Sequence, residues 1–379
     1  MDSLERVIHD RHLFGPGPSN PYPEATNALA RPLLGHLDPA FLAIMDEACE
    51  MLRTVWGTTN ARTLSISATG SAGMEAAFVN TVHDGDVVVV AVNGLFGQRM
   101  CDVAARCGAE VVAVDHEWGR PVDVDRVLSA HPSPAIVAAV HAETSTGVRS
   151  DVAALGAGLR SSGVDALLLV DAVTSIAGIE LATDDWGIDV GYAGTQKCLG
   201  VAPGLAPFTI NDRAFARRVE KPRSWYLDLN LLGGYVGEAG VVAGGKGGAR
   251  TYHHTAPVAM VVSLHAALVR ILEEGLPAVW ARHEDAGRRL QDGLQEMGLE
   301  LFAAEGSRLP ELTTVKVPDG ADSAAVRRYL LEVHDLEIGS GAGAFAGTVW
   351  RIGLMGHNAR PDAALLVLAA LKDALAQAG

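Results

Sequence analysis

Ala166-Leu167-Leu168-Leu169-Val170-Asp171 is the stretch that decides the fold, because an unbroken apolar run ends there in a single carboxylate. A strand that is apolar on both faces must be covered by helices on both sides, as in a parallel sheet. Similar strand-like segments at residues 63–67, 86–92, 110–114 and 135–141 alternate with helix-like segments. This alternation predicts an α/β fold whose mostly parallel sheet lies between layers of helices.

The C-terminal third shows a different order of elements. Helical patterns at residues 258–274 and 280–297 precede short strands and helices that alternate to the end of the chain. This order predicts a small α+β domain, and the chain is long enough for two cores. Gly15-Pro16-Gly17-Pro18-Ser19-Asn20 forms a stiff turn near the start. We therefore expect an N-terminal arm (1–20), a large domain (21–256) and a small C-terminal domain (257–379).

Composition and charge argue against several classes of protein. The formal net charge is −15, and no run of Lys and Arg supplies a basic patch, so we expect no nucleic-acid partner. The four cysteines lack CxxC spacing, which favours a reducing compartment. The start, MDSLERVIHD, has no apolar signal segment, and the apolar stretch at 257–272 contains His265 and Arg270. We expect a cytoplasmic protein without a membrane span.

Lys197 stands out among the five lysines of the chain. It lies in Tyr192-Ala193-Gly194-Thr195-Gln196-Lys197-Cys198-Leu199-Gly200, which carries no other charge. Desolvation lowers the pKa of a lysine amine and makes it nucleophilic, as Schiff-base chemistry requires. A lysine that extends its amine to the surface is the alternative. The local sequence favours neither reading over the other.

Asp171 shifts the balance toward the chemical reading of Lys197. It ends a buried strand, and ligands bind at the carboxyl edge of open α/β sheets. A buried carboxylate needs a cationic partner, and a protonated ring nitrogen of a cofactor would be one. A ribose-binding aspartate and a helix N-cap are the alternatives. The ribose reading is weak, because no GxGxxG turn precedes the strand at the proper distance.

Two further motifs fit this site. Thr69-Gly70-Ser71 joins a strand to a helix, where free backbone N–H groups form a phosphate cradle, although many helices begin this way. Arg351 stands in an otherwise apolar strand. Its guanidinium either forms a structural ion pair or binds a substrate carboxylate, and the presence of Lys197 and Asp171 favours the carboxylate.

Other motifs carry no function in this interpretation. The glycine-rich residues 240–247 resemble a P-loop but lack the final Ser or Thr, and residues 339–343 precede a strand where a dinucleotide turn precedes a helix. His253 and His254 are adjacent, so in a strand they would point to opposite faces, and we expect no metal. Cys198 is expected to be a small buried residue.

Six ordered motifs resemble those of class V, fold-type-I enzymes that use pyridoxal 5′-phosphate (PLP), most closely the alanine–glyoxylate and serine–pyruvate aminotransferases. The resemblance covers nearly the whole chain. It implies transfer of an amino group between a small amino acid (alanine, serine or a glycine-like donor) and a small 2-oxo acid (glyoxylate or pyruvate). Its most specific motifs are Asn93-Gly94-Leu95-Phe96-Gly97-Gln98-Arg99, His141-Ala142-Glu143-Thr144-Ser145-Thr146-Gly147, Val170-Asp171, Gly194-Thr195-Gln196-Lys197, Tyr252-His253-His254-Thr255 and Trp350-Arg351-Ile352-Gly353.

The resemblance also implies a role for each matching residue. Lys197 carries the cofactor covalently and acts in catalysis, Asp171 pairs with the pyridine nitrogen, and Arg351 binds the substrate carboxylate. The remaining cofactor contacts are Thr69, Gly70, Ser71 and Gln196 at the phosphate, Phe96 and Val173 at the ring faces, and Thr144 at the ring oxygen. Tyr252 and Thr255 reach the phosphate of the neighbouring subunit, which implies a homodimer with composite active sites.

The chain departs from the family pattern in ways that leave the substrate open. Phe96 replaces a common Trp, and Thr69 and Thr144 replace common Ser residues. Within the same fold, the alternatives are an aminotransferase with a specialised biosynthetic donor, a phosphoserine-type aminotransferase and a cysteine desulfurase. The phosphoserine type needs extra basic residues, whereas the desulfurase typically has His where this chain has Gln196. A catalytically silent PLP-fold binding or regulatory protein is the alternative from another class.

Overall fold

A seven-stranded sheet forms the centre of the large domain. In the computed structural model, which describes residues 9–236 and 250–378, its strands lie in the order β2-β10-β9-β8-β5-β3-β4. Within this sheet only β10 runs antiparallel to its neighbours. The predicted α/β fold with a mostly parallel sheet is confirmed. The strands are β2 (Arg62–Ile66), β3 (Val87–Val92), β4 (Glu110–Asp115), β5 (Ile136–Val140), β8 (Leu167–Asp171), β9 (Val190–Tyr192) and β10 (Ala206–Ile210).

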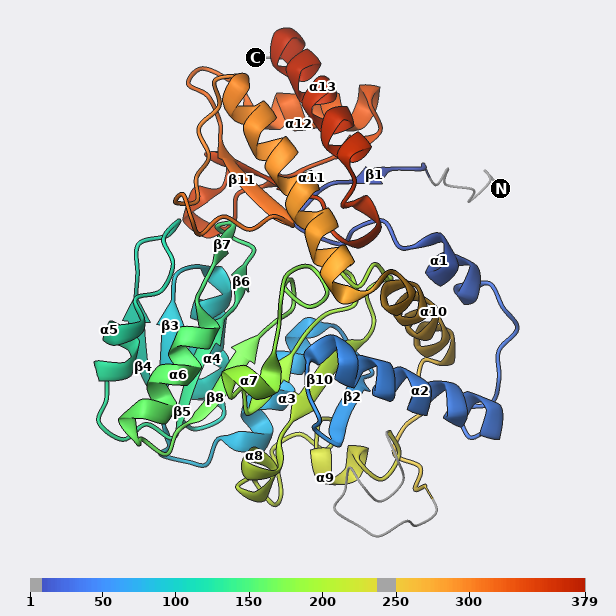
Figure 1. The fold of residues 1–379 in the computed structure, drawn as a ribbon, viewed down its shortest axis with the longest axis vertical. Coiled ribbons are helices and arrows are strands. Elements are labelled where there is room, and N and C mark those ends of the chain that lie inside the picture. Colours follow the sequence, from blue (N-terminus) through green and yellow to red (C-terminus); the bar gives the residue numbers. More distant parts are fainter. Residues whose placement is uncertain (1–8, 237–249, 379) are drawn as a thin grey trace, which may run out of the picture.

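Helices cover this sheet in two groups (Figure 1). One group contains α3 and α4, which contact each other and the strands between β10 and β4. The other contains α5, α6 and α7, in which α6 contacts both of its neighbours. The apolar residues of β8 are therefore buried on both faces. The bounds are α3 (Gly70–Thr81), α4 (Leu95–Arg106), α5 (Val124–Ser129), α6 (Val152–Ser162) and α7 (Thr183–Trp186).

A third group of helices packs beside β2. It contains α1 (Pro23–Leu29), α2 (Pro39–Trp56) and α10 (Val258–Glu274). The ends of α2 are set by its sequence: the Asp38 carboxylate accepts a hydrogen bond from Ala40 N at 2.8 Å, and Gly57 adopts φ 62° after the last turn. Because α10 packs in the core of the large domain, that core continues past the predicted boundary at residue 256 and reaches Val279.

The C-terminal part has a second hydrophobic core. A three-stranded sheet in the order β11-β14-β13 packs with α11, α12 and α13. Phe14 of the N-terminal arm belongs to this core, and β1 pairs with β12. The bounds are β1 (His12–Leu13), α11 (Leu276–Glu296), β11 (Leu312–Lys316), α12 (Ser323–Val333), β12 (Leu336–Glu337), β13 (Gly339–Ser340), β14 (Val349–Gly353) and α13 (Pro361–Ala378).

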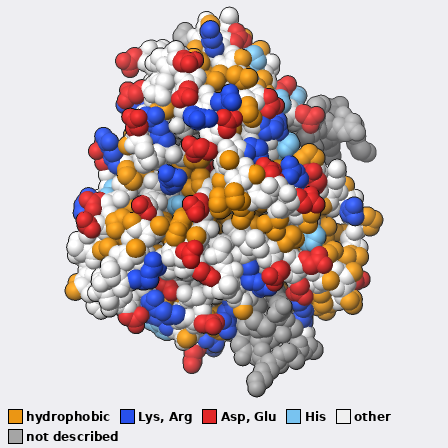
Figure 2. Space-filling view, in the orientation of Figure 1, with side chains coloured by type: hydrophobic (Ala, Val, Ile, Leu, Met, Phe, Trp, Pro, Cys, Tyr) orange, Lys and Arg blue, Asp and Glu red, His pale blue; other side chains and the backbone are white. Residues whose placement is uncertain are grey.

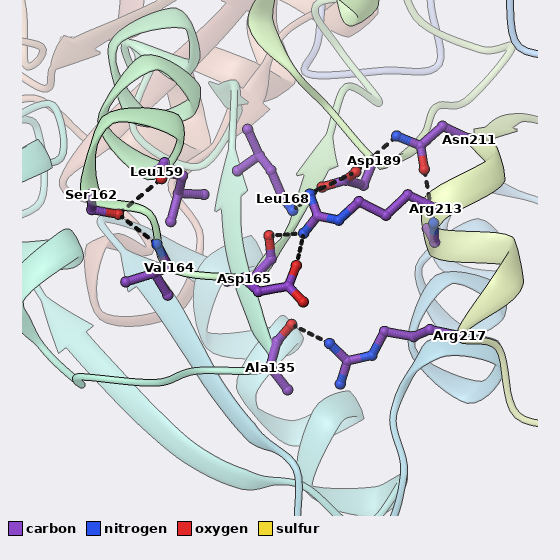
Figure 3. A network of polar contacts seen from close by, with 12 residues as sticks. Ala135, Leu159, Ser162, Val164, Asp165, Leu168, Asp189, Asn211, Arg213 and Arg217 are labelled. Carbon is purple, nitrogen blue, oxygen red and sulfur yellow. Dashed lines mark hydrogen bonds and ion pairs between the residues drawn. The ribbon is translucent and has the colours of Figure 1, made fainter.

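A polar network fastens α8 (Asp212–Ala216) to the amino-terminal edge of the sheet (Figure 3). The buried Asp189 carboxylate accepts hydrogen bonds from Leu168 N at 2.7 Å and Asn211 Nδ2 at 2.8 Å. The Arg213 guanidinium lies 3.4 Å from the same carboxylate and 3.3 Å from that of Asp165. These bonds lie at the start of β8, so they support the strand at the end opposite Asp171.

The surface is mixed in charge. Figure 2 shows Lys and Arg side chains interspersed with Asp and Glu on the visible face, and hydrophobic side chains over the region of α1 and α2. No helix within residues 9–236 and 250–378 is long and apolar enough to cross a bilayer.

The histidine pair differs from its expected geometry. His253 and His254 do not lie in a strand. Both are buried, and their Nδ1 atoms lie 2.8 Å apart, so the expectation that they point to opposite faces is wrong. The alternation of side chains between two faces holds only in a strand, and residues 253–254 are not in one. Residues 240–247, which resemble a P-loop, lie outside the described residues.

Candidate active site

Lys197 lies in the turn between β9 and β10, among residues with almost no exposed surface. Its side chain is 9% exposed, and its amine donates to the carbonyl oxygen of Pro16. Burial, together with the nearby charge of Arg351, lowers the pKa of this amine to about 8. No carboxylate of the described residues forms an ion pair with it. The alternative of a surface-extended lysine is therefore wrong.

Asp171 ends β8, next to the strand that leads to Lys197. Its side chain is 3% exposed. Its carboxylate accepts hydrogen bonds from Val173 N and from the Tyr192 hydroxyl, both at 2.8 Å. Burial nevertheless raises the pKa of Asp171 to about 6, because two hydrogen bonds and the charge of Lys197 do not fully replace water. The site thus contains a buried acid and a buried amine without a direct ion pair between them.

The N-terminal arm covers Lys197. Ser19 N donates to the carbonyl oxygen of Gln196 at 3.0 Å, and Ser19 Oγ donates to the carbonyl oxygen of Lys197 at 3.1 Å. Gly17 has φ +105°, and a Cβ there would lie 2.3 Å from Lys197 Nζ. Only glycine combines this backbone conformation with this close approach. The predicted stiff turn therefore forms one wall of the site.

Arg351 projects from β14 of the small domain toward the same site. Its Nε donates to the carbonyl oxygen of Ser340 at 2.8 Å, and its Nη1 to that of Thr144 at 3.3 Å. Within the described residues it forms no ion pair, so the structural ion pair considered above is wrong. A half-buried guanidinium that bonds only to carbonyl oxygens keeps its charge for another carboxylate.

Glu143 connects the turn that bears Thr144 to the start of α4. It lies on β6 (Ala142–Glu143), which pairs with β7 (Val148–Arg149). Its fully buried carboxylate accepts from Phe96 N at 3.1 Å, Ser145 N at 3.0 Å and Ser145 Oγ at 2.6 Å. Burial raises its pKa to about 7 despite these bonds. Glu143 thus fixes the backbone from which the Phe96 ring projects.

The predicted phosphate cradle lies at the first turn of α3. Thr69 is the N-cap residue, but its side chain makes no capping hydrogen bond, and Gln196 Oε1 is buried without a partner. A Cβ at Gly70 would lie 2.9 Å from the Val173 side chain, so α3 begins in close contact with the segment after Asp171. Uncapped N–H groups are suited to a bound anion. The amide oxygen of Gln196 is an acceptor, so Gln196 would contact an anion through its Nε2 donor.

Two predicted residues lie apart from the others. Tyr252 is 59% exposed, and its hydroxyl lies 3.3 Å from Thr255 Oγ1. Its ring contacts those of His36 and Tyr235. The contacts found for Tyr252 and Thr255 include none with Lys197, Asp171 or the first turn of α3.

Three residues of the site were missed by sequence reasoning. Glu143 and Arg99 lie inside the motifs that suggested the family, but no role was assigned to them. Tyr192 was missed altogether, although it opens the lysine segment and hydrogen-bonds Asp171. Recognising the end of β9 could have placed Tyr192 and the segment leading to Lys197 at one sheet edge, but a three-residue strand gives a weak signal.

A buried aspartate at the end of β8, a buried lysine in the turn after β9 and an arginine without an ion pair in the described residues are features of an α/β enzyme. A family model described as aminotransferase class-V matches residues 20–362. The chain belongs to this family. It is a PLP-dependent aminotransferase that exchanges an amino group between amino and oxo acids.

Individual relatives agree with this assignment. The chain is 38% identical to alanine–glyoxylate aminotransferase of Drosophila melanogaster, over 98% of this chain and 94% of that protein. It is 36% identical to (S)-ureidoglycine–glyoxylate transaminase of Bacillus subtilis, over 96% and 90%. The structure of alanine–glyoxylate aminotransferase from Nostoc sp. superposes with a TM-score of 0.91 at 44% identity, covering 98% of this chain and 97% of that one. The fold-type-I architecture is therefore confirmed.

The lowered pKa of Lys197 predicts a distinctive reactivity toward small acylating reagents. Labelling of apo protein at Lys197 should rise with pH around a midpoint of about 8, since only the neutral amine reacts. Peptide mass mapping measures each lysine separately, and Lys316, paired with Glu300 at the surface, is the internal reference. If Lys197 and Lys316 show the same pH dependence, the proposed desolvation of Lys197 is wrong.

Proposed function

We propose that this chain transfers the amino group of a small amino acid to a small 2-oxo acid such as glyoxylate or pyruvate, with PLP attached to Lys197. The observation that carries the proposal is the Arg351 guanidinium, which has no acidic partner in the described residues and stands beside the buried amine. Relatives named for glyoxylate support the choice of acceptor.

The residues present suit PLP. The first turn of α3 has no side-chain cap, so its N–H groups can donate to a phosphate, and the buried Asp171 carboxylate has a raised pKa, so it can accept a cationic ring nitrogen as a partner. We assign Thr69, Gly70, Ser71 and Gln196 to the phosphate and Asp171 to the ring nitrogen. Phe96 and Val173 would contact the ring faces, and Thr144 its oxygen. When bound, PLP accepts the electron pair of the substrate α-carbon.

The chain's own groups account for binding and proton transfer. Arg351 holds the substrate carboxylate, and its bonds to the carbonyl oxygens of Ser340 and Thr144 fix the direction of its guanidinium. Lys197, as a neutral amine, removes and returns the proton at the substrate α-carbon. Its lowered pKa keeps a useful fraction neutral near pH 7–8. Holding both groups in one frame supplies part of the rate acceleration.

The N-terminal arm favours a small substrate. Pro16 and Gly17 lie directly against the Lys197 side chain. A Cβ on Gly353 would lie 2.3 Å from the carbonyl oxygen of Gly15, so the arm is also packed tightly against β14. The arm thus forms a closely packed wall beside Lys197 and against β14. We propose that this wall favours small donors such as alanine, serine or glycine.

The thiols disfavour a cysteine desulfurase. That reaction needs a reactive thiolate on an accessible loop, but burial raises the pKa of all four cysteines. Cys198, next to Lys197, is fully buried, as expected for a small structural residue. A silent binding protein is disfavoured because Lys197, Asp171 and Arg351 are all present.

We further propose that two copies form the active enzyme. Leu33 is 73% exposed and Tyr252 is 59% exposed. A groove of about 490 Å³ runs between residues 33–36 and 255–260, and its lining is largely apolar. This apolar groove lies beside the hydroxyls of Tyr252 and Thr255, which contact none of the other candidate site residues within the described part of their own chain. Such a surface is suited to binding a second copy of the chain. Tyr252 and Thr255 would then reach the phosphate in the partner subunit.

The role of Arg351 predicts a selective loss in Arg351→Gln. The value of kcat/KM for α-amino acid donors should fall about 10- to 100-fold, because one charge-assisted contact is lost. An amine donor without an α-carboxylate should lose much less. Donors are compared against glyoxylate and pyruvate, with Arg289→Gln on the surface of α11 as the control. Equal losses for both kinds of donor would contradict carboxylate binding by Arg351.

The composite site predicts complementation between two inactive variants. Lys197→Ala lacks the amine, whereas the double variant Tyr252→Ala/Thr255→Ala lacks the contacts offered to the partner. In a mixed dimer, one site combines an intact lysine with an intact Tyr252 and Thr255. Mixing the two variants should therefore give more activity than either alone. If mass measurement confirms mixed dimers but activity does not rise, the composite site is wrong.

A further inference from the structure

Arg99 lies on α4, one turn after Phe96, and faces the candidate site. Its Cζ atom lies 4.8 Å from the centroid of the Phe96 ring, a cation–π distance. The backbone of Phe96 is held by the hydrogen bond from Phe96 N to Glu143. Arg99 therefore lies on the same part of α4 as Phe96, the residue expected to contact the cofactor ring.

The guanidinium of Arg99 also reaches the first turn of α3. Its Nη1 donates to Ser71 Oγ at 3.4 Å. No carboxylate of residues 9–236 and 250–378 forms an ion pair with it. Arg106, two turns further along α4, instead pairs with Asp102 at 3.0 Å. The two arginines share a helix, but only Arg99 has its charge available at the site.

The proposed phosphate contacts lack a positive charge. Thr69, Gly70, Ser71 and Gln196 are neutral, and so are Tyr252 and Thr255, which the partner would add. A phosphate monoester carries a charge of about −1.5 to −2 near pH 7. The N–H groups and the partial positive charge at the start of α3 compensate only part of that charge. The positive charge of Arg99 acts at this end of the sheet. It partly offsets the burial that raises the pKa of Asp171 and of Tyr192.

We infer that Arg99 is the cation that binds the phosphate of the cofactor, from a position between the Phe96 ring and Ser71 Oγ. This inference rests on the proposed function, because it takes the first turn of α3 as the phosphate site. Arg99 would bind through its charge and its planar N–H groups. The Phe96 ring limits the orientations open to the guanidinium and thereby places it near Ser71.

A purely structural role is the competing explanation. In that case Arg99 would only connect α4 to α3 through Ser71 and support the Phe96 ring. Its loss would then weaken binding of the ring and of the phosphate to the same degree. PLP and pyridoxal, which has the same ring without phosphate, distinguish the two explanations.

The test measures the equilibrium affinity of apo protein for PLP and for pyridoxal. Arg99→Gln should bind PLP about 10- to 100-fold more weakly and leave the affinity for pyridoxal nearly unchanged. Arg99→Lys should recover part of the loss, because it keeps the charge but not the planar fork. Inorganic phosphate should compete with PLP less effectively in Arg99→Gln than in the wild type. Arg106→Gln is the matched control on α4.

Each outcome bears on one claim. Equal losses for PLP and pyridoxal in Arg99→Gln, or no loss for either, would overturn the phosphate role of Arg99. Thermal melting of the apo variants identifies unfolding, and Arg99→Lys still tests the inference if Arg99→Gln does not fold. Wild-type protein that bound no PLP at all would instead overturn the proposed function. Failure of the inference and failure of the function are thus distinguishable.

Discussion

The burial of two opposite charges at the carboxyl edge of the sheet is the constraint on which the rest of the site depends. Lys197 and Asp171 are almost fully buried, yet they form no direct ion pair. Each keeps a shifted pKa, lowered for the amine and raised for the acid. Bringing charges into a low-dielectric interior without pairing them is unfavourable. A group that contacts both residues relieves this cost, which explains why the site suits a cofactor with an aldehyde and a ring nitrogen.

The surrounding elements hold the two charges in place. β8 and β9 are adjacent and parallel, so Asp171 and the segment leading to Lys197 emerge at the same edge. Glu143 joins this edge to the start of α4, and Arg351 joins it to the small domain through the carbonyl oxygen of Thr144. Ser19 of the N-terminal arm closes the remaining side. The site is therefore assembled from segments far apart in the sequence.

The sequence predicted local features better than long-range ones. The runs that became β8 and α10 were predicted because their hydrophobic patterns lie within neighbouring residues. Lys197 was singled out by its uncharged surroundings, and its side chain is buried in the structure. The antiparallel direction of β10 was not predicted, because pairing partners leave no trace within one strand. The contact between Gly17 and Lys197 was also missed, since it joins residues far apart in the chain.

Covalent trapping tests the central claim most directly. Purified protein is incubated with PLP and reduced with borohydride, and its peptides are mapped by mass spectrometry. The account predicts that the phosphopyridoxyl group is found on the peptide that carries Lys197, and that an amino acid donor added before reduction lowers its amount. A modification spread over the surface lysines, or an unmodified Lys197, would contradict it.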